Sequence, residues 1–249
     1  MSSEPRSFRQ RLVRILTKTS HASAPFITTF LLIHLSAPVL ANIGGSSLSS
    51  QVMLLGREYY QTKLGEPYLV LGPLAVHALS GIIRRALISY PKLKAPANAS
   101  SSFLGRIRSV LPTTVLPLTG FATALLLPIH FCIHRLLPTT SSPPVSSLGP
   151  SELDFSFVQY GLHNYPIVSW TLYATLVGAA VIHAVEGGRV LLDPKFRRKL
   201  LAVAIALPVL SGLYFLHTEP MYIFPDMAKR LEALPYVTYP NTSTICING

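Results

Sequence analysis

Hydrophobic residues are gathered into five long runs, which are separated by shorter polar stretches. Each run is near the roughly 20 residues that an α-helix needs to cross the hydrocarbon core of a bilayer. The pattern therefore predicts five transmembrane helices, at residues 22–43, 67–90, 113–137, 166–190 and 199–217. Neighbouring helices in a membrane satisfy the backbone groups that proline frees. The prolines inside these runs are therefore expected to kink the helices rather than end them; they are Pro73, Pro117, Pro128 and Pro208.

The runs divide the chain into three segments. Residues 1–21 form a basic amphipathic N-terminal segment, residues 22–217 form the transmembrane domain, and residues 218–249 form a C-terminal tail that is expected along the membrane interface. The basic segment has two interpretations, a mitochondrial transit peptide or a flank that anchors the first span at an anionic surface. The flank is favoured because the chain runs directly into a span.

The composition supports a membrane protein. Hydrophobic residues make up 49% of the chain and charged residues only 12%, against about 25% charged residues in average soluble domains. The sequence contains no nucleophile elbow, no glycine-rich phosphate loop and no His-Glu-x-x-His motif. It also lacks an aromatic and basic patch of the kind that binds nucleic acid. We therefore expect an all-α, polytopic membrane helix bundle that is not an enzyme, whose immediate partner is the lipid bilayer.

The distribution of basic residues predicts an orientation. Lysine and arginine accumulate on loops that stay on the side of synthesis. With five spans, alternate segments hold 16 and five of the 21 basic residues. The N-terminus is therefore expected on the cytosolic side and the C-terminus across the membrane. The flanking pattern also accounts for the net charge of +11.

Histidines recur at matching places inside the apolar runs. His77 and His183 each begin the motif His-Ala-x-x-Gly. The apolar run before each of them carries another histidine, His34 and His130, ten residues after a small residue. The small residues are Ala24 and Gly120. This order predicts a two-fold internal repeat, although the two histidines of each half are 43 residues apart in one and 53 in the other.

Ionisable residues inside a span are costly and usually face the bundle interior, so these four histidines are a candidate functional site. Neutral imidazole is an axial ligand of haem iron. Two stacked haem b groups are conceivable, one held by His34 with His130 and the other by His77 with His183. Arginines near the second pair would then meet the haem propionates; they are Arg84, Arg85 and Arg189.

Two other interpretations of the histidines stay open. Each imidazole can hydrogen-bond a neighbouring helix, a contact worth about 0.6 to 2 kcal/mol, or the four can form a proton or ion relay. The remaining histidines lie near span ends and are expected at the membrane interface; they are His21, His134, His163 and His217.

Residues 22–217 resemble a known family. The five spans, a small residue ten positions before the first-helix histidines, and Pro73-x-x-x-His77-Ala-x-x-Gly81-x-x-Arg84 resemble the fungal MCP family of mitochondrial outer-membrane proteins. That family is in turn similar in layout to the cytochrome b membrane anchors of succinate dehydrogenase and fumarate reductase. By this resemblance, His34, His77, His130 and His183 match the axial positions of the anchors.

The resemblance implies a role in mitochondrial lipid homeostasis. Members of the MCP family suppress loss of the tether between the endoplasmic reticulum and mitochondria, and recruit a bridge-like lipid-transfer protein. Such recruitment is expected to use a Pro-x-Pro peptide, and no Pro-x-Pro occurs in this chain.

The sequence thus predicts a multi-pass protein of the mitochondrial outer membrane that acts as an adaptor at organelle contact sites, with its C-terminus in the intermembrane space. One alternative is a haem b-binding electron carrier. Another is a bundle that conducts lipid or solute. Asn241-Thr-Ser is an N-glycosylation acceptor on the tail, so a secretory location predicts a glycan there, whereas a mitochondrial one predicts none.

Overall fold

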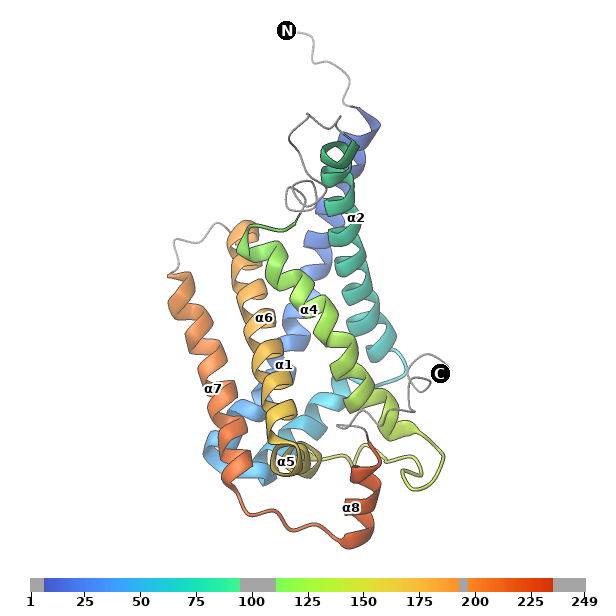
Figure 1. The fold of residues 1–249 in the computed structure, drawn as a ribbon, viewed down its shortest axis with the longest axis vertical. Coiled ribbons are helices and arrows are strands. Elements are labelled where there is room, and N and C mark those ends of the chain that lie inside the picture. Colours follow the sequence, from blue (N-terminus) through green and yellow to red (C-terminus); the bar gives the residue numbers. More distant parts are fainter. Residues whose placement is uncertain (1–6, 95–110, 193–196, 235–249) are drawn as a thin grey trace, which may run out of the picture. The chain divides into compact units, whose positions relative to one another are not determined.

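The computed structural model describes residues 7–94, 111–192 and 197–234, and regular structure in these ranges is entirely helical (Figure 1). Within them, five helices are long and apolar enough to cross a membrane. They are Phe8–Tyr60, Gly65–Tyr90, Val115–Thr139, Pro166–Leu191 and Arg198–Thr218. The predicted all-helical, five-span class is confirmed. Residues 1–6 of the predicted basic segment, and Asn241 of the predicted glycosylation acceptor, lie outside the described residues.

Helix α1 (Phe8–Tyr60) is much longer than the predicted first span. It includes most of the predicted basic segment and much of the predicted first loop. Its only non-helical backbone is at Gly44 and Gly45, where φ is −129° and +58°. Glycine accepts a positive φ at little cost because it has no Cβ atom, so the break falls where the sequence allows it.

A carboxylate from the end of another helix caps this break. Glu219, which follows α7 (Arg198–Thr218), accepts hydrogen bonds from the Ser46 backbone nitrogen at 2.8 Å and from the Ser46 hydroxyl at 3.1 Å. The first N–H groups of a helix have no partner within the helix, and they favour a negative charge. Glu219 therefore stabilises the start of the second part of α1.

The chain forms two compact units, and α1 contributes to both. The first comprises Met1–Leu32 and Tyr59–Leu118, and it contains a π-helix, η1 (Gly65–Leu71), that leads directly into α2 (Gly72–Lys94). The Gly72 nitrogen bonds to the Pro67 carbonyl, five residues back. Pro73 has no N–H to continue an α-helical pattern, and a π-turn is one of the ways a helix accommodates such a position.

The second unit comprises Ile33–Glu58 and Thr119–Gly249. Its described helices after α1 are most of α4 (Val115–Phe131), η2 (Cys132–Leu136), η3 (Leu137–Thr139), α5 (Phe155–Asn164), α6 (Pro166–Leu192), α7 and α8 (Pro225–Glu232). Helices α6 and α7 lie side by side (Figure 1). One hydrophobic core of this unit joins α1, α5, α6 and α7 through Ala37, Ala41, Phe155, Val158, Leu162, Tyr173, Leu213 and Leu216.

Helix α1 approaches α7 closely at Gly212. A side chain on Gly212 would collide with the Pro38 carbonyl. Beside it, the Asn42 amide donates to the Pro208 carbonyl at 2.8 Å and accepts from the Ser211 hydroxyl at 2.8 Å. Small residues and such polar contacts are the usual means of helix association in lipid, where burial of apolar surface gives no driving force.

Residues after the third and fifth spans pack together. The loop after η3, α5 and α8 share a second core, in which Leu231 and Leu234 are each about 1% exposed. Arg230 donates to the Val145 carbonyl at 2.8 Å and to Glu152 at 2.7 Å. The described part of the tail is therefore packed against the 139–154 loop, and its expected position along the interface stays a prediction.

Candidate functional site

Two of the predicted histidines meet in the second unit. His34 on α1 and His130 on α4 have ring centroids 5.9 Å apart with an interplanar angle of 83°. These are the two histidines that the haem hypothesis pairs, and here their rings are in direct contact. His130 is also stacked on His134, one turn further along, at 4.3 Å. We call these three residues the histidine cluster.

Aromatic side chains from α5 and α6 pack against the histidine cluster. The Tyr173 hydroxyl lies 3.2 Å from His134 Nε2, and the Phe157 ring lies 5.0 Å from the His134 ring. Tyr173 and Phe157 are 7% and 2% exposed. The three histidines are themselves half-buried, and His134 contacts α5 and α6 within the second unit; its expected place at the membrane interface stays a prediction.

A small hollow lies beside the cluster. Its volume is about 10 Å³, which is room for about one water molecule. Its lining is Leu126, His130, Ile133, His134, Ser169, Leu172, Tyr173 and Leu176. Pockets for drug-sized ligands and cofactors measure about 300 to 1,000 Å³. A haem between the His34 and His130 rings would therefore require these helices to separate from the positions they have here.

His77 has its own partners in the first unit. Its Nδ1 lies 3.0 Å from the Ser20 carbonyl oxygen and 3.3 Å from the hydroxyls of Ser20 and Ser23. A carbonyl oxygen can only accept, so Nδ1 carries the proton in this hydrogen bond. A hydrogen bond from Nδ1 to a backbone carbonyl is also found in many histidines that ligate metals through Nε2.

His183 occupies the matching place in the second unit. A Cβ atom on Gly120 would lie 2.8 Å from His183 Cε1, so the ring rests directly on the α4 backbone. Ser23 precedes His34 by eleven residues, and Gly120 precedes His130 by ten. In each half, the second histidine thus contacts the first helix about three turns before the first histidine. This shared contact supports the predicted repeat, and it is an observation within each unit separately.

The predicted pairing of His77 with His183 joins residues of different units, and it stays a prediction. The arginines predicted to meet haem propionates have other surroundings. Arg189 lies 3.7 Å from Glu186, and Arg85 donates to the Leu111 carbonyl at 3.0 Å. Arg84 is half-buried on α2. In the described residues, no group of three or more histidine, cysteine, aspartate or glutamate side chains is arranged to hold a metal ion.

Sequence reasoning missed several partners of the histidines. Tyr173 lies 43 residues from His130, so no local pattern connects it to the cluster. The contact of His163 with His217, at 5.3 Å between ring centroids, was missed for the same reason. The spacing of His134 four residues after His130 was a usable signal, because residues i and i+4 lie on one face of a helix.

The second half of the predicted repeat has a known relative. Residues 125–222 match the family model described as the transmembrane domain of MDM10-complementing protein 1. No curated protein sequence matches the chain. No solved structure matches it either, so the similarity in layout to cytochrome b anchors finds no support. The part of the chain from α4 to just beyond α7, with His130 and His183, is therefore similar to the transmembrane domain of MDM10-complementing protein 1.

Proposed function

We propose that this protein belongs to the MCP family and is an integral protein of the mitochondrial outer membrane that acts in lipid homeostasis, as an adaptor at organelle contact sites. The match of residues 125–222 to the transmembrane domain of MDM10-complementing protein 1 carries the proposal. That family is named for a protein that complements MDM10. By analogy with that protein, we expect the present chain to have the same role in the mitochondrial outer membrane.

The packing of the second unit favours an adaptor over a catalyst. Polar groups in its interior connect helices in the contacts of Asn42 with Pro208 and of Glu219 with Ser46. The hollow at the histidine cluster has room for about one water molecule. This hollow offers a substrate little space, and the proposed adaptor role uses the surfaces of the bundle instead.

A bridge-like lipid-transfer protein is the proposed partner. Because the chain has no Pro-x-Pro peptide, the partner is expected to recognise another cytosolic segment. On the proposed orientation, the cytosolic segments are residues 1–21, the connection from α2 to α4, and the connection from α6 to α7.

Complementation tests this function. The full chain is expressed in fungal cells that lack MDM10, and growth and mitochondrial phospholipid content are measured. Rescue is expected from the wild type and from His34→Ala/His130→Ala, because an adaptor does not need the imidazoles. Gly212→Leu, which cannot pack α7 on α1, is the matched loss-of-fold control. A folded protein that reaches mitochondria without any rescue would contradict the adaptor role.

Location is tested separately. Protease treatment of intact mitochondria is expected to remove an N-terminal tag and spare a C-terminal one. A glycosidase shift at Asn241 would place the chain in the secretory pathway, and it would overturn the proposed location whatever the outcome of complementation.

A haem b-binding electron carrier is the second candidate. It would use His34 and His130, whose ring centroids lie 5.9 Å apart, and it requires their helices to separate to admit the haem. A carrier predicts reducible Soret and α bands in protein purified from haem-replete cells, with loss of bands in His34→Ala or His130→Ala. A featureless spectrum, oxidised and reduced, would leave these histidines as contacts between helices.

A further inference from the structure

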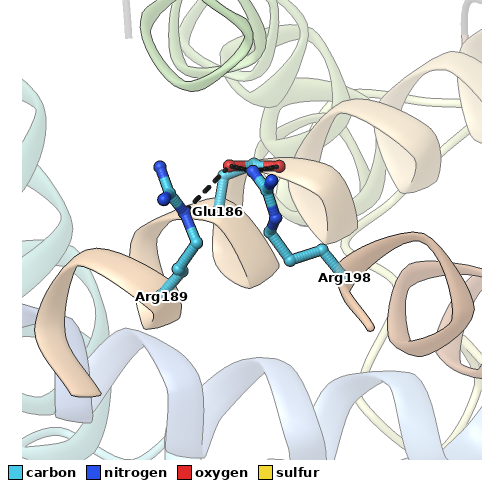
Figure 2. Close-up of polar contacts among 3 residues, drawn as sticks. All are labelled: Glu186, Arg189 and Arg198. Atoms are coloured by element: carbon cyan, nitrogen blue, oxygen red, sulfur yellow. Dashed lines mark hydrogen bonds and ion pairs between the residues drawn. The ribbon is translucent and has the colours of Figure 1, made fainter. Parts of the chain in front are cut away.

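Two arginines meet one glutamate where α6 ends and α7 begins (Figure 2). Arg198, the first residue of α7, places Nη1 at 3.1 and 3.0 Å from the two carboxylate oxygens of Glu186. Arg189, one turn after Glu186 on α6, places Nε at 3.7 Å from the same carboxylate. The two guanidinium groups approach it from opposite sides (Figure 2). We call these three residues the arginine clamp.

The clamp carries an excess of positive charge that faces outward. The side chains of Arg189 and Arg198 are 48% and 46% exposed, whereas that of Glu186 is 18% exposed. One carboxylate against two guanidinium groups leaves a net charge of +1. Each guanidinium has five N–H donors, and the hydrogen bonds to Glu186 use one nitrogen of Arg198. An anion with several oxygens therefore fits beside the clamp.

The clamp lies at the ends of two candidate spans, Pro166–Leu191 and Arg198–Thr218. A span that crosses the hydrocarbon core ends at the depth of the lipid headgroups. Apolar side chains next to the clamp are open to the surroundings, with Val190 52% and Leu200 62% exposed. These side chains offer a surface to acyl chains, directly beside the charged groups.

We propose that Arg189 and Arg198, positioned by Glu186, bind the phosphate of an anionic phospholipid. Arginine binds phosphate through parallel N–H···O bonds, and basic pockets at helix ends are typical binding places for acidic headgroups. Glu186 holds both side chains in place before the lipid arrives, which reduces the entropy lost on binding. A zwitterionic headgroup brings an ammonium group that the clamp repels. The proposal rests on α6 and α7 alone and goes beyond the adaptor role.

Lipid titration of the purified full chain in detergent tests the site. The probes are dioctanoyl phosphatidic acid, dioctanoyl phosphatidylcholine and inorganic phosphate, and bound lipid is counted by native mass spectrometry. Phosphatidic acid is expected to bind the wild type most tightly. Arg189→Ala/Arg198→Ala is expected to weaken it about twenty-fivefold, at about fivefold for each basic residue. Lys229→Ala is the control, because Lys229 is in a comparable exposed pair with Asp226, at 3.6 Å on α8.

Unchanged phosphatidic acid binding in the double alanine variant would overturn the proposal. Equal binding of inorganic phosphate and phosphatidic acid would overturn it too, because the ligand would then be free phosphate. Arg189→Lys/Arg198→Lys keeps the charge and removes the planar donor geometry, and it serves if the alanine variant fails to fold. A partial loss of binding is expected for it, and full wild-type binding would contradict phosphate recognition by the guanidinium groups. Failure here leaves complementation of MDM10 unaffected, so the two proposals can fail separately.

Discussion

The His183 ring lies directly on the Gly120 backbone, where a Cβ atom would be 2.8 Å from Cε1. Gly120→Ala is therefore expected to destabilise the protein by about 1 to 3 kcal/mol, as overpacking usually does. Thermal unfolding in detergent measures the effect. Gly178→Ala is the matched control on α6, because nothing lies within 4 Å of a Cβ atom at that position.

The contact of His183 with Gly120 predicts that the stability effects of substitutions at the two positions are coupled. In Gly120→Ala/His183→Ala the ring is gone, so the added methyl group has room and the two effects should not be additive. Equal stability of Gly120→Ala and Gly178→Ala, or simple additivity in the double variant, would show that the ring does not rest on α4 as described.

Tyr173→Phe removes the hydroxyl that lies 3.2 Å from His134 Nε2. Hydrogen bonds between membrane helices contribute about 0.6 kcal/mol on average and up to about 1.7, and a loss in this range is expected. A double-mutant cycle with His134→Phe isolates the bond from the packing of the ring. A coupling energy of zero in that cycle would rule out the hydrogen bond.

Gly45→Ala should be more destabilising than an ordinary glycine substitution in a helix. Its φ of +58° disfavours a Cβ atom, and that atom would lie 2.8 Å from the Glu219 carboxylate. With ψ at −152°, Gly45 lies in a backbone region that essentially only glycine adopts, which costs other residues about 1 to 3 kcal/mol. Glu219→Ala removes the cap from Ser46, which typically costs about 0.5 to 2 kcal/mol.

The effects of Gly45→Ala and Glu219→Ala are measured as shifts of the unfolding midpoint. Gly81→Ala and Asp226→Ala are the controls. Gly81 has no atom within 4 Å of a Cβ position, and Asp226 is a 95% exposed carboxylate on α8. If Glu219→Ala and Asp226→Ala were equally stable, the carboxylate would not stabilise the break in α1.

The packing of α8 against the 139–154 loop is expected to weaken in acid. The Gly149 backbone N–H and the Arg230 side chain donate to Glu152 and lower the pKa of that carboxyl below its ordinary value of 4.5. A lowered pKa stabilises the folded state above the ordinary value, and the contribution is lost as the pH falls through the folded value. The unfolding midpoints of the wild type and Glu152→Gln should therefore differ at neutral pH and converge below about pH 4.5.

Glu232→Gln changes the same charge at an exposed position of α8 and serves as the control. A gap between the wild type and Glu152→Gln that stayed constant down to pH 3 would contradict the expected role of the ionised carboxylate.

The spans could be predicted from the sequence because length and hydropathy are strong constraints in a bilayer. The fourth was expected at 166–190 and is found at Pro166–Leu191. The motif His-Ala-x-x-Gly led to the repeat, and the contacts of His77 and His183 fit it. Both features depend on residues that are close together in the sequence.

Two features could not be predicted in the same way: the packing of the 139–154 loop with α5 and α8, and the break in α1. Helix α5 has only ten residues, too few for a clear periodic signal. Its visible signal is Asp154, whose side chain accepts from the Ser156 nitrogen as an N-cap. The two glycines at 44 and 45 permit a break, but the carboxylate that stabilises it is far along the chain, and only the tertiary structure brings it there.

The capped break has a consequence for the order of assembly. Glu219 reaches Ser46 across 173 residues of sequence. At about 5 to 20 residues per second, a ribosome needs roughly 9 to 35 seconds to synthesise that interval. During this time the second part of α1 exists without its cap. The second part of α1, in the first helix to be made, therefore receives its stabilising carboxylate only after the last span has been completed.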